Sequence, residues 1–212
     1  MTLGVQLQQG LTALGLALPE SAQAQLLSYL VLLKKWNATY NLTSIREESA
    51  MLTQHLLDSL SILPHLEKSA LVARRWVDVG SGAGLPGIPL AIACPQIQMA
   101  LIDSVDKKTA FQRQVKIELG LSNLTILGGR VENQPPAQFD AVISRAFSDL
   151  ADFVSLAGHL LVEGGTLYAM KGQLPHEEIA RIPAGWHVAQ CLPLEVPGMV
   201  AERHLIFLQR DR

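Results

Sequence analysis

Charged residues are scarce in this sequence, at 17% of its 212 residues, and it has only two cysteines. The low charge content, together with 49% hydrophobic residues, argues against a disordered or fibrous chain and predicts a globular protein with a sizeable core. Cys94 and Cys191 stand far apart, and neither belongs to a Cys-x-x-Cys pair. We therefore expect two reduced thiols in a cytoplasmic protein, and no metal site.

Long apolar runs and a basic amino terminus are also missing. No uncharged apolar stretch reaches the roughly 18 residues of a membrane span, so we expect no membrane association. No lysine or arginine precedes Lys34, whereas a secretory signal starts with basic residues. The net charge of −2 gives no overall sign of nucleic-acid binding, so such a role would depend on local clusters of basic residues. We expect a cytoplasmic monomer.

Two kinds of periodicity divide the chain near residue 70. Residues 1–70 carry leucines at helical spacing without strand-like alternation, which predicts a helical amino-terminal extension. Within it, we expect one helix to end near Trp36-Asn37 and another to run over about 47–60. In residues 71–212, short apolar runs alternate with helical segments, which predicts an α/β domain with a mainly parallel sheet covered on both faces. The expected strands are 74–80, 97–103, 124–127, 139–144, 165–170, 188–194 and 204–208, with helices over 86–93, 106–119 and 149–161.

The most informative segment follows the first expected strand. It reads Val77-Asp78-Val79-Gly80-Ser81-Gly82-Ala83-Gly84-Leu85-Pro86-Gly87. Glycines at this place let the backbone turn tightly and let a ligand approach closely. Asp103 ends the second expected strand, where a carboxylate can accept hydrogen bonds from the ribose hydroxyls of an adenosine cofactor.

Two kinds of cofactor fit this segment. Gly82-Ala-Gly84-Leu-Pro-Gly87 matches the Gly-x-Gly-x-x-Gly fingerprint, so an NAD(P)-binding oxidoreductase is one alternative. Asp78 favours S-adenosyl-L-methionine, because a carboxylate repels a pyrophosphate but attracts the ammonium and sulfonium of that cofactor. No tyrosine here belongs to the Tyr-x-x-x-Lys pair that an oxidoreductase could use. A non-catalytic RNA- or ribosome-binding protein is the third possibility.

The segment after the fourth strand limits the methyl acceptor. It reads Ser144-Arg145-Ala146-Phe147 and lacks the Asn/Asp-Pro-Pro-aromatic loop of enzymes that methylate exocyclic amines of nucleic acids. Neither cysteine is placed to attack a pyrimidine ring carbon. A ring nitrogen such as guanine N7 has a free lone pair, so it needs alignment with the methyl group rather than a base. The residues themselves identify no catalytic acid or base.

Together these segments resemble one family, the bacterial small-subunit ribosomal RNA guanine-N7 methyltransferases, also called glucose-inhibited division protein B. The matching segments are Asn41-Leu42-Thr43, His55-Leu-Leu-Asp58-Ser59-Leu60, residues 78–92, Leu101-Ile-Asp103-Ser104 with Lys107-Lys108, Arg130-Val131-Glu132, Ser144-Arg145-Ala146-Phe147, Met170-Lys171-Gly172 and Glu202-Arg203-His204-Leu205. The resemblance implies a Rossmann-like class I S-adenosylmethionine-dependent methyltransferase sheet with an amino-terminal helical extension. It also implies methylation of guanine 527 in 16S ribosomal RNA, on the RNA or the 30S subunit.

The resemblance further implies a cofactor site that includes Gly80, Leu85, Val131, Glu132 and Arg145, with Asp103 toward the ribose. With the glycine loop, the expected cofactor residues are Asp78, Gly80, Gly82, Gly84, Leu85, Asp103, Val131, Glu132 and Arg145. One departure from the family is Gln112-Arg113, where leucine is common at the first position. We interpret it as a packing change that does not affect the cofactor site.

A second set of residues is expected to contact RNA or to position the substrate. It comprises Asn41, His55, Asp58, Lys107, Lys108, Arg113, Lys171 and Arg203. His55 and Asp58 stand three residues apart on a predicted helix, so they could hydrogen-bond, and either pin the extension to the sheet or shape an acceptor pocket. Asn41 suits a turn or cap as well as an RNA contact. Residues 103–130 carry a net charge of +2, which suits either a solvated helix face or phosphate contacts.

Overall fold

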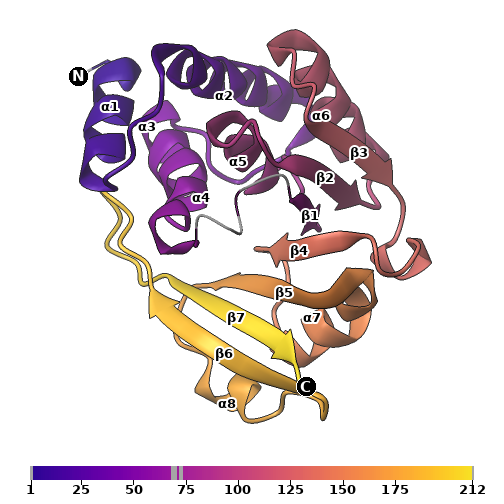
Figure 1. Ribbon diagram of the computed structural model, residues 1–212. Coiled ribbons are helices and arrows are strands. Elements are labelled where there is room, and N and C mark those ends of the chain that lie inside the picture. Colours follow the sequence, from indigo (N-terminus) through magenta and orange to yellow (C-terminus); the bar gives the residue numbers. More distant parts are fainter. Residues whose placement is uncertain (1, 68–70, 72–73, 212) are drawn as a thin grey trace.

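The computed structural model describes residues 2–67, 71 and 74–211. Its centre is a seven-stranded sheet with the strand order β3-β2-β1-β4-β5-β7-β6 (Figure 1). Strands β1 to β5 are paired in parallel, and β7 is antiparallel to both of its neighbours. The predicted mainly parallel sheet is therefore confirmed. The strands are β1 (Arg75–Val79), β2 (Gln98–Asp103), β3 (Leu124–Gly128), β4 (Phe139–Ser144), β5 (Leu161–Lys171), β6 (Trp186–Pro193) and β7 (His204–Arg210).

Helices cover both faces of this sheet (Figure 1). The amino-terminal helices pack with α5 and α6 on one face, whereas α7 packs on the other. The helices of the extension are α1 (Leu3–Ala13), α2 (Glu20–Tyr40), α3 (Glu48–Met51), the π-helix η1 (Leu52–Leu57), α4 (Asp58–Leu60) and the 3₁₀-helix η2 (Leu63–His65). The later helices are α5 (Gly87–Ala93), α6 (Asp106–Leu119), α7 (Leu150–Ala157) and α8 (His176–Ile179), with 3₁₀ turns η4 (Val131–Asn133) and η5 (Gly158–Leu160).

One apolar core joins the extension to the sheet. Leu33 and Leu60 of the extension belong to the same buried cluster as Trp76 and Ile143 of the sheet. Because side chains alternate along a strand, β1 turns Trp76 toward this cluster and Val77 toward the cluster under α7. A strand buried on both faces reads as a continuous apolar run, which is why the sequence predicts these strands well.

The expected end of the second helix near Trp36-Asn37 is wrong. α2 continues to Tyr40, and Asn41 closes it in the left-handed conformation, with φ of 48°. Asparagine adopts this conformation at helix ends more readily than most residues. Asn37 is buried instead: its Nδ2 donates to the Ile45 carbonyl (3.3 Å), and its Oδ1 accepts from the Thr43 amide (2.8 Å).

The strand order fixes where a ligand can bind. The order reverses between β1 and β4, which are paired neighbours. Open α/β sheets bind ligands at the carboxyl ends of their strands, at such a switch point. Because β7 is antiparallel, its amino end lies at the same edge, next to the carboxyl end of β5. Among the described residues, no helix has both the length and the apolarity needed to cross a membrane.

Candidate active site

The glycine loop after β1 turns tightly at the middle of the carboxyl edge. The amides of Gly80 and Ser81 both donate to the Ile102 carbonyl, at 2.9 and 3.1 Å, and the Gly82 amide donates to Asp103 Oδ2 at 2.8 Å. Gly80 has φ of +70°, and a Cβ there would lie 2.7 Å from the Cβ of Ala146. Only glycine therefore fits between the ends of β1 and β4.

A cavity of about 410 Å³ opens beside this loop, and we call it the glycine-loop cavity. Four of the nine expected cofactor residues line it, namely Gly80, Asp103, Val131 and Glu132. Asp103 is 5% exposed and also accepts from the Val105 amide at Oδ1 (2.9 Å). Each carboxylate oxygen of Asp103 thus accepts from one backbone amide. Oδ1 keeps a second lone pair for a ligand, whereas Oδ2 also lies 3.5 Å from Lys108 Nζ.

The other five expected cofactor residues do not line this cavity. Gly82 and Gly84 form the turn itself, with φ of +59° and +85°, and Leu85 is buried in the apolar core. Asp78 lies beneath the loop, and Arg145 faces a different cavity. These residues shape the loop or line the neighbouring cavity.

Asp78 is completely buried, and its Oδ2 accepts from the Gly87 amide at 2.8 Å. Its Oδ1 has no hydrogen-bond partner in the described part of the chain. Burial raises the pKa of Asp78 to about 7, although the Gly87 amide and the charge of Arg145 act in the opposite direction. A buried carboxyl group with a free oxygen and a pKa near neutrality is typical of a functional site.

Gln112 contradicts the interpretation that its position is only a packing change. Its side chain is completely buried, and Nε2 donates to the Gly82 carbonyl (2.8 Å) and to the Ser81 hydroxyl (2.9 Å). The same Gly82 peptide holds Asp103 through its amide. Gln112 therefore supports the glycine loop from α6. No local pattern predicts this contact, because the two segments are about 30 residues apart and meet only in the folded chain.

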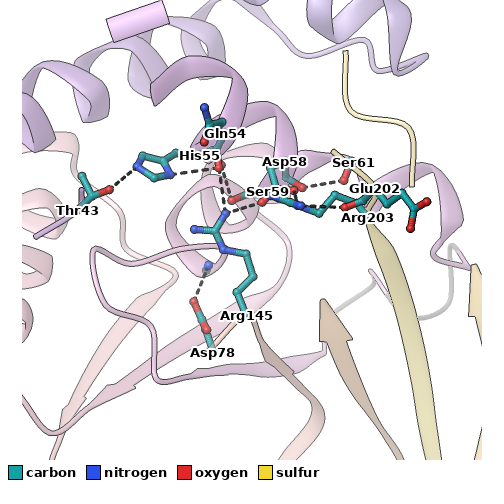
Figure 2. A network of polar contacts seen from close by, with 11 residues as sticks. Thr43, Gln54, His55, Asp58, Ser59, Ser61, Asp78, Arg145, Glu202 and Arg203 are labelled. Atoms are coloured by element: carbon teal, nitrogen blue, oxygen red, sulfur yellow. Dashed lines mark hydrogen bonds and ion pairs between the residues drawn. The ribbon is translucent and has the colours of Figure 1, made fainter. Parts of the chain in front are cut away.

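A second cavity, of about 320 Å³, lies where the extension meets the carboxyl edge, and we call it the arginine cavity. Asp58 of α4 binds two arginines there (Figure 2). Arg145 Nη1 lies 2.6 Å from Asp58 Oδ2, and Arg203 Nε lies 2.9 Å from Oδ1. Arg145 follows β4 and Arg203 precedes β7, so Asp58 ties the extension to two parts of the sheet. The residues that line the cavity are Ile45, Gln54, His55, Asp58, Arg145, Met170, Lys171, Gly172 and Arg203.

The sequence predicts one regular helix that carries His55 and Asp58. In the structure this helix contains the π-helix η1. The two side chains line the same cavity yet bind different partners. His55 Nε2 lies 3.0 Å from the Thr43 hydroxyl, whereas Asp58 binds the arginines (Figure 2). Burial, with the charge of Arg145, lowers the pKa of His55 to about 4. His55 is therefore neutral near pH 7, and π-helical turns are frequent at functional sites.

The remaining residues of the expected RNA set have partners within the chain. Lys107 donates to the Tyr40 carbonyl (2.9 Å), whereas Lys108 points into the glycine-loop cavity, 3.5 Å from Asp103. Arg113 donates to the Thr109 hydroxyl, and Asn41 accepts from Arg46. Lys171 forms an ion pair with Glu178 and donates to two backbone carbonyls. The structure brings His55, Asp58, Lys171 and Arg203 to the arginine cavity and leaves Asn41, Lys107 and Arg113 outside it.

Two further features limit the chemistry. Cys94 caps the end of α5 and Cys191 lies on β6, and neither lines the glycine-loop or the arginine cavity. Burial raises the pKa of Cys94 to about 11, which makes its thiol a poor nucleophile. Among the residues with described positions, no cluster of His, Cys, Asp and Glu could hold a metal ion.

Comparison with known proteins decides the family. The model of the family described as rRNA small subunit methyltransferase G matches residues 22–206, which include every residue that lines either cavity. The chain belongs to this family. Two relatives with the name Ribosomal RNA small subunit methyltransferase G come from Aromatoleum aromaticum and Azoarcus sp.. They are 57% and 53% identical over 210 and 206 residues, which cover 97% of this chain and 98% and 95% of the relatives.

Solved structures share the fold of this rRNA small subunit methyltransferase G family member at much lower identity. The Mitomycin 7-O-methyltransferase MmcR matches with a TM-score of 0.62 and 16% identity over 77% of this chain and 56% of that one. A SAM-dependent methyltransferase from Thiobacillus denitrificans, in complex with S-adenosyl-L-homocysteine, matches with a TM-score of 0.51 and 13% identity over 73% and 90%. The predicted Rossmann-like class I methyltransferase fold is therefore confirmed.

Proposed function

We propose that this chain transfers a methyl group from S-adenosyl-L-methionine to N7 of a guanine in 16S ribosomal RNA, guanine 527 by the family resemblance. Membership of the rRNA small subunit methyltransferase G family makes it an S-adenosylmethionine-dependent rRNA methyltransferase. The target atom, the target base and the residue roles below are our proposal. We also propose that the protein is a cytoplasmic monomer and that it acts on the 16S RNA or the 30S subunit.

One observation supports this proposal most strongly. The glycine-loop cavity and the arginine cavity lie on either side of the segment that follows β4. Arg145 lines the arginine cavity, and the next two residues, Ala146 and Phe147, line the other. A transfer reaction needs a donor and an acceptor held next to each other. In this arrangement, residues adjacent in the sequence line the two sites.

The residues of the glycine-loop cavity fit an adenosine group. Asp103 and Glu132 offer carboxylate oxygens to ribose hydroxyls, and Val131 offers an apolar side chain to the adenine ring. The bare backbone at Gly80 leaves room where a Cβ would meet Ala146. Asp78, whose Oδ1 has no hydrogen-bond partner among the described residues and whose Oδ2 accepts from the Gly87 amide, would favour the positive charges of the methionine end.

The chemistry asks little of the protein beyond alignment. The bound cofactor supplies an electrophilic methyl group on a sulfonium. Guanine N7 carries a lone pair, so no side chain must remove a proton, which agrees with the pKa of about 4 that makes His55 a weak base. The guanidinium groups of Arg145 and Arg203 could donate to guanine O6, an acceptor beside N7, and leave N7 free to react. Asp58 would hold both groups in place.

Methyl transfer from labelled S-adenosyl-L-methionine to 30S subunits and to naked 16S RNA tests the proposal. We expect one methyl group per RNA, mapped to N7 of guanine 527. Calorimetric titration with NADH is the matched control and should show no binding. Methylation of a different base, or of an exocyclic amine, would overturn the assignment of the acceptor.

Replacing Asp103 by alanine should weaken cofactor binding roughly 5- to 150-fold, because a hydrogen-bonded charge contributes about 1–3 kcal/mol. Calorimetry with S-adenosyl-L-homocysteine measures the change. Asp106→Ala removes an exposed carboxylate from the next helix and should leave affinity unchanged. Equal affinity of Asp103→Ala and the wild type would exclude a ribose contact at Asp103.

A further inference from the structure

Four aromatic rings, each next to the following one, form a row that leads from the glycine loop to the surface. Tyr29 donates its hydroxyl proton to the Ala83 carbonyl (2.9 Å), and its ring lies 6.2 Å from that of Phe111. Phe111 lies 5.6 Å from Trp36, and Trp36 lies 5.2 Å from Tyr40, measured between ring centres. Tyr29 and Phe111 are buried, Trp36 is half-buried, and Tyr40 is 42% exposed. Tyr40 is the only aromatic residue in the described part of the chain with such exposure.

Tyr40 is fixed in place although it lies on the surface. It is the last residue of α2, and Trp36, one helical turn earlier, supports its ring from below. Lys107, in the first turn of α6, donates to its carbonyl at 2.9 Å. A ring with a fixed orientation loses little further freedom when a partner stacks on it. Lys107 is itself exposed and brings a positive charge beside the ring.

The position of Tyr40 relates it to both cavities. Lys108, next to the anchoring Lys107, reaches Asp103 in the glycine-loop cavity. Three residues after Tyr40, Thr43 contacts His55 in the arginine cavity. Three residues of chain span about 10 Å at most, so the backbone of Tyr40 lies within that distance of Thr43, whose hydroxyl contacts a residue that lines the proposed acceptor site. Arg46 is exposed on the same connecting segment, and the exposed carboxylates nearest in sequence are those of Glu47, beside Arg46, and Asp106, beside Lys107.

We infer that the exposed Tyr40 ring is a stacking platform for an unpaired RNA base that flanks the methylated guanine, with Lys107 close to the adjoining phosphate. The inference rests on the proposed function and extends it to the substrate. Proteins recognise single-stranded RNA by stacking bases on aromatic rings and by pairing phosphates with basic side chains. A fixed exposed tyrosine with an adjacent lysine supplies both. A folded protein partner would instead be expected to use a larger apolar patch.

Steady-state methylation of whichever substrate the wild type uses, 30S subunits or naked 16S RNA, tests this inference. Tyr40→Ala should raise KM for the RNA roughly 5- to 100-fold, with kcat within about twofold and an unchanged Kd for S-adenosyl-L-homocysteine. Tyr40→Phe keeps the ring and should restore the wild-type KM. Lys107→Gln should reduce the slope of log KM against log salt by about one. Ile117→Ala and Lys116→Gln, at the other end of α6, are the matched controls and should have no effect.

The outcomes separate this inference from the proposed function. If the wild type methylates its RNA but Tyr40→Ala has an unchanged KM, the platform is overturned and the proposed function stands. If Tyr40→Phe loses as much as Tyr40→Ala, the hydroxyl rather than the ring contacts the substrate, and stacking is overturned. Absence of methyl transfer by the wild type would overturn both.

Discussion

Replacing Asp78 by asparagine is expected to stabilise the fold at about pH 8 and, at the same time, to weaken cofactor binding. The carboxyl group is completely buried, and its pKa rises from an ordinary 3.8 to about 7 on folding. A raised pKa means that the folded state prefers the protonated form. The stability that this preference provides is complete below about pH 4 and is lost as pH rises through about 7. Above that pH the folded protein carries a buried charge.

Asparagine removes that charge and keeps the shape of the side chain. A pKa that rises from 3.8 to about 7 corresponds to roughly 4 kcal/mol against the ionised folded state, so the gain in unfolding free energy should reach about 2–4 kcal/mol. The Gly87 amide still finds an oxygen to bind. Urea unfolding should show the advantage of Asp78→Asn growing from about pH 4 to pH 7 and then becoming constant.

Cofactor affinity should change in the opposite direction. Loss of the carboxylate removes an attraction for the cationic cofactor, so affinity should fall roughly tenfold. Wild-type affinity should also fall when pH is lowered from about 7.5 to 5.5, as Asp78 becomes protonated, whereas the affinity of Asp78→Asn should not. His55, with a pKa of about 4, remains neutral over this range and does not interfere.

Calorimetric titration of both proteins across this range measures the affinities, and Asp106→Asn controls for the loss of one exposed carboxylate. A variant that is more stable yet binds the cofactor as tightly as the wild type would contradict the electrostatic role of Asp78. A variant that is less stable at about pH 8 would contradict the argument from burial. We predict that Asp78→Asn combines a higher unfolding free energy with weaker cofactor binding. Buried charges at active sites commonly lower stability while they serve function.

The sequence predicted the glycine-loop half of the site because that half is local. A strand, a glycine turn and a carboxylate at the end of the next strand follow one another within about 30 residues, and parallel pairing brings Asp103 beside Gly82 without further information. The sequence also predicts the strands of the sheet, because they are apolar on both faces. The structure corrects the end of α2, which a single asparagine decides, and the regular helix expected over 47–60, which contains η1.

The arginine cavity could be predicted only as a list of residues. Asp58 and Arg203 are 145 positions apart, and nothing local pairs them. Lys107 and Lys108 show the same limit at short range. Both were expected to contact RNA, yet neighbours on a helix point in directions about 100° apart, and one meets Tyr40 while the other meets Asp103. The burial of Gln112 beneath the glycine loop likewise depends on how α6 packs, which no local pattern reveals.

Asp58→Asn should destabilise the protein by about 3 kcal/mol and lower kcat/KM on the order of 10- to 100-fold. The Asp58 side chain is 3% exposed and neutralises two guanidinium groups, so its loss leaves two like charges facing each other in a partly buried site. Such losses are typically 3–5 kcal/mol, and we expect the lower end because Arg145 and Arg203 are 23% and 26% exposed and can regain water. Activity should fall because both arginines would leave their positions at the proposed acceptor site.

Asp140→Asn provides the matched control at the opposite edge of the sheet. Asp140 also contacts two arginines, Arg74 and Arg75, but at 3.5 and 3.8 Å and with 20% exposure. An exposed pair of this kind contributes at most about 1 kcal/mol, and it lies far from both cavities, so activity should be unchanged. We propose that the helical extension, residues 1–70, and the α/β domain, residues 71–212, form one compact unit, which gives the experiment a second readout. If residues 1–70 and 71–212 fold as one unit, joined by a shared core and by Asp58, urea unfolding of Asp58→Asn should remain one transition at lower urea. Two separate transitions would show that Asp58 had been joining independent domains. Equal stability of the Asp58→Asn and Asp140→Asn variants would mean that the two ion pairs of Asp58 contribute no more than those of Asp140, at most about 1 kcal/mol.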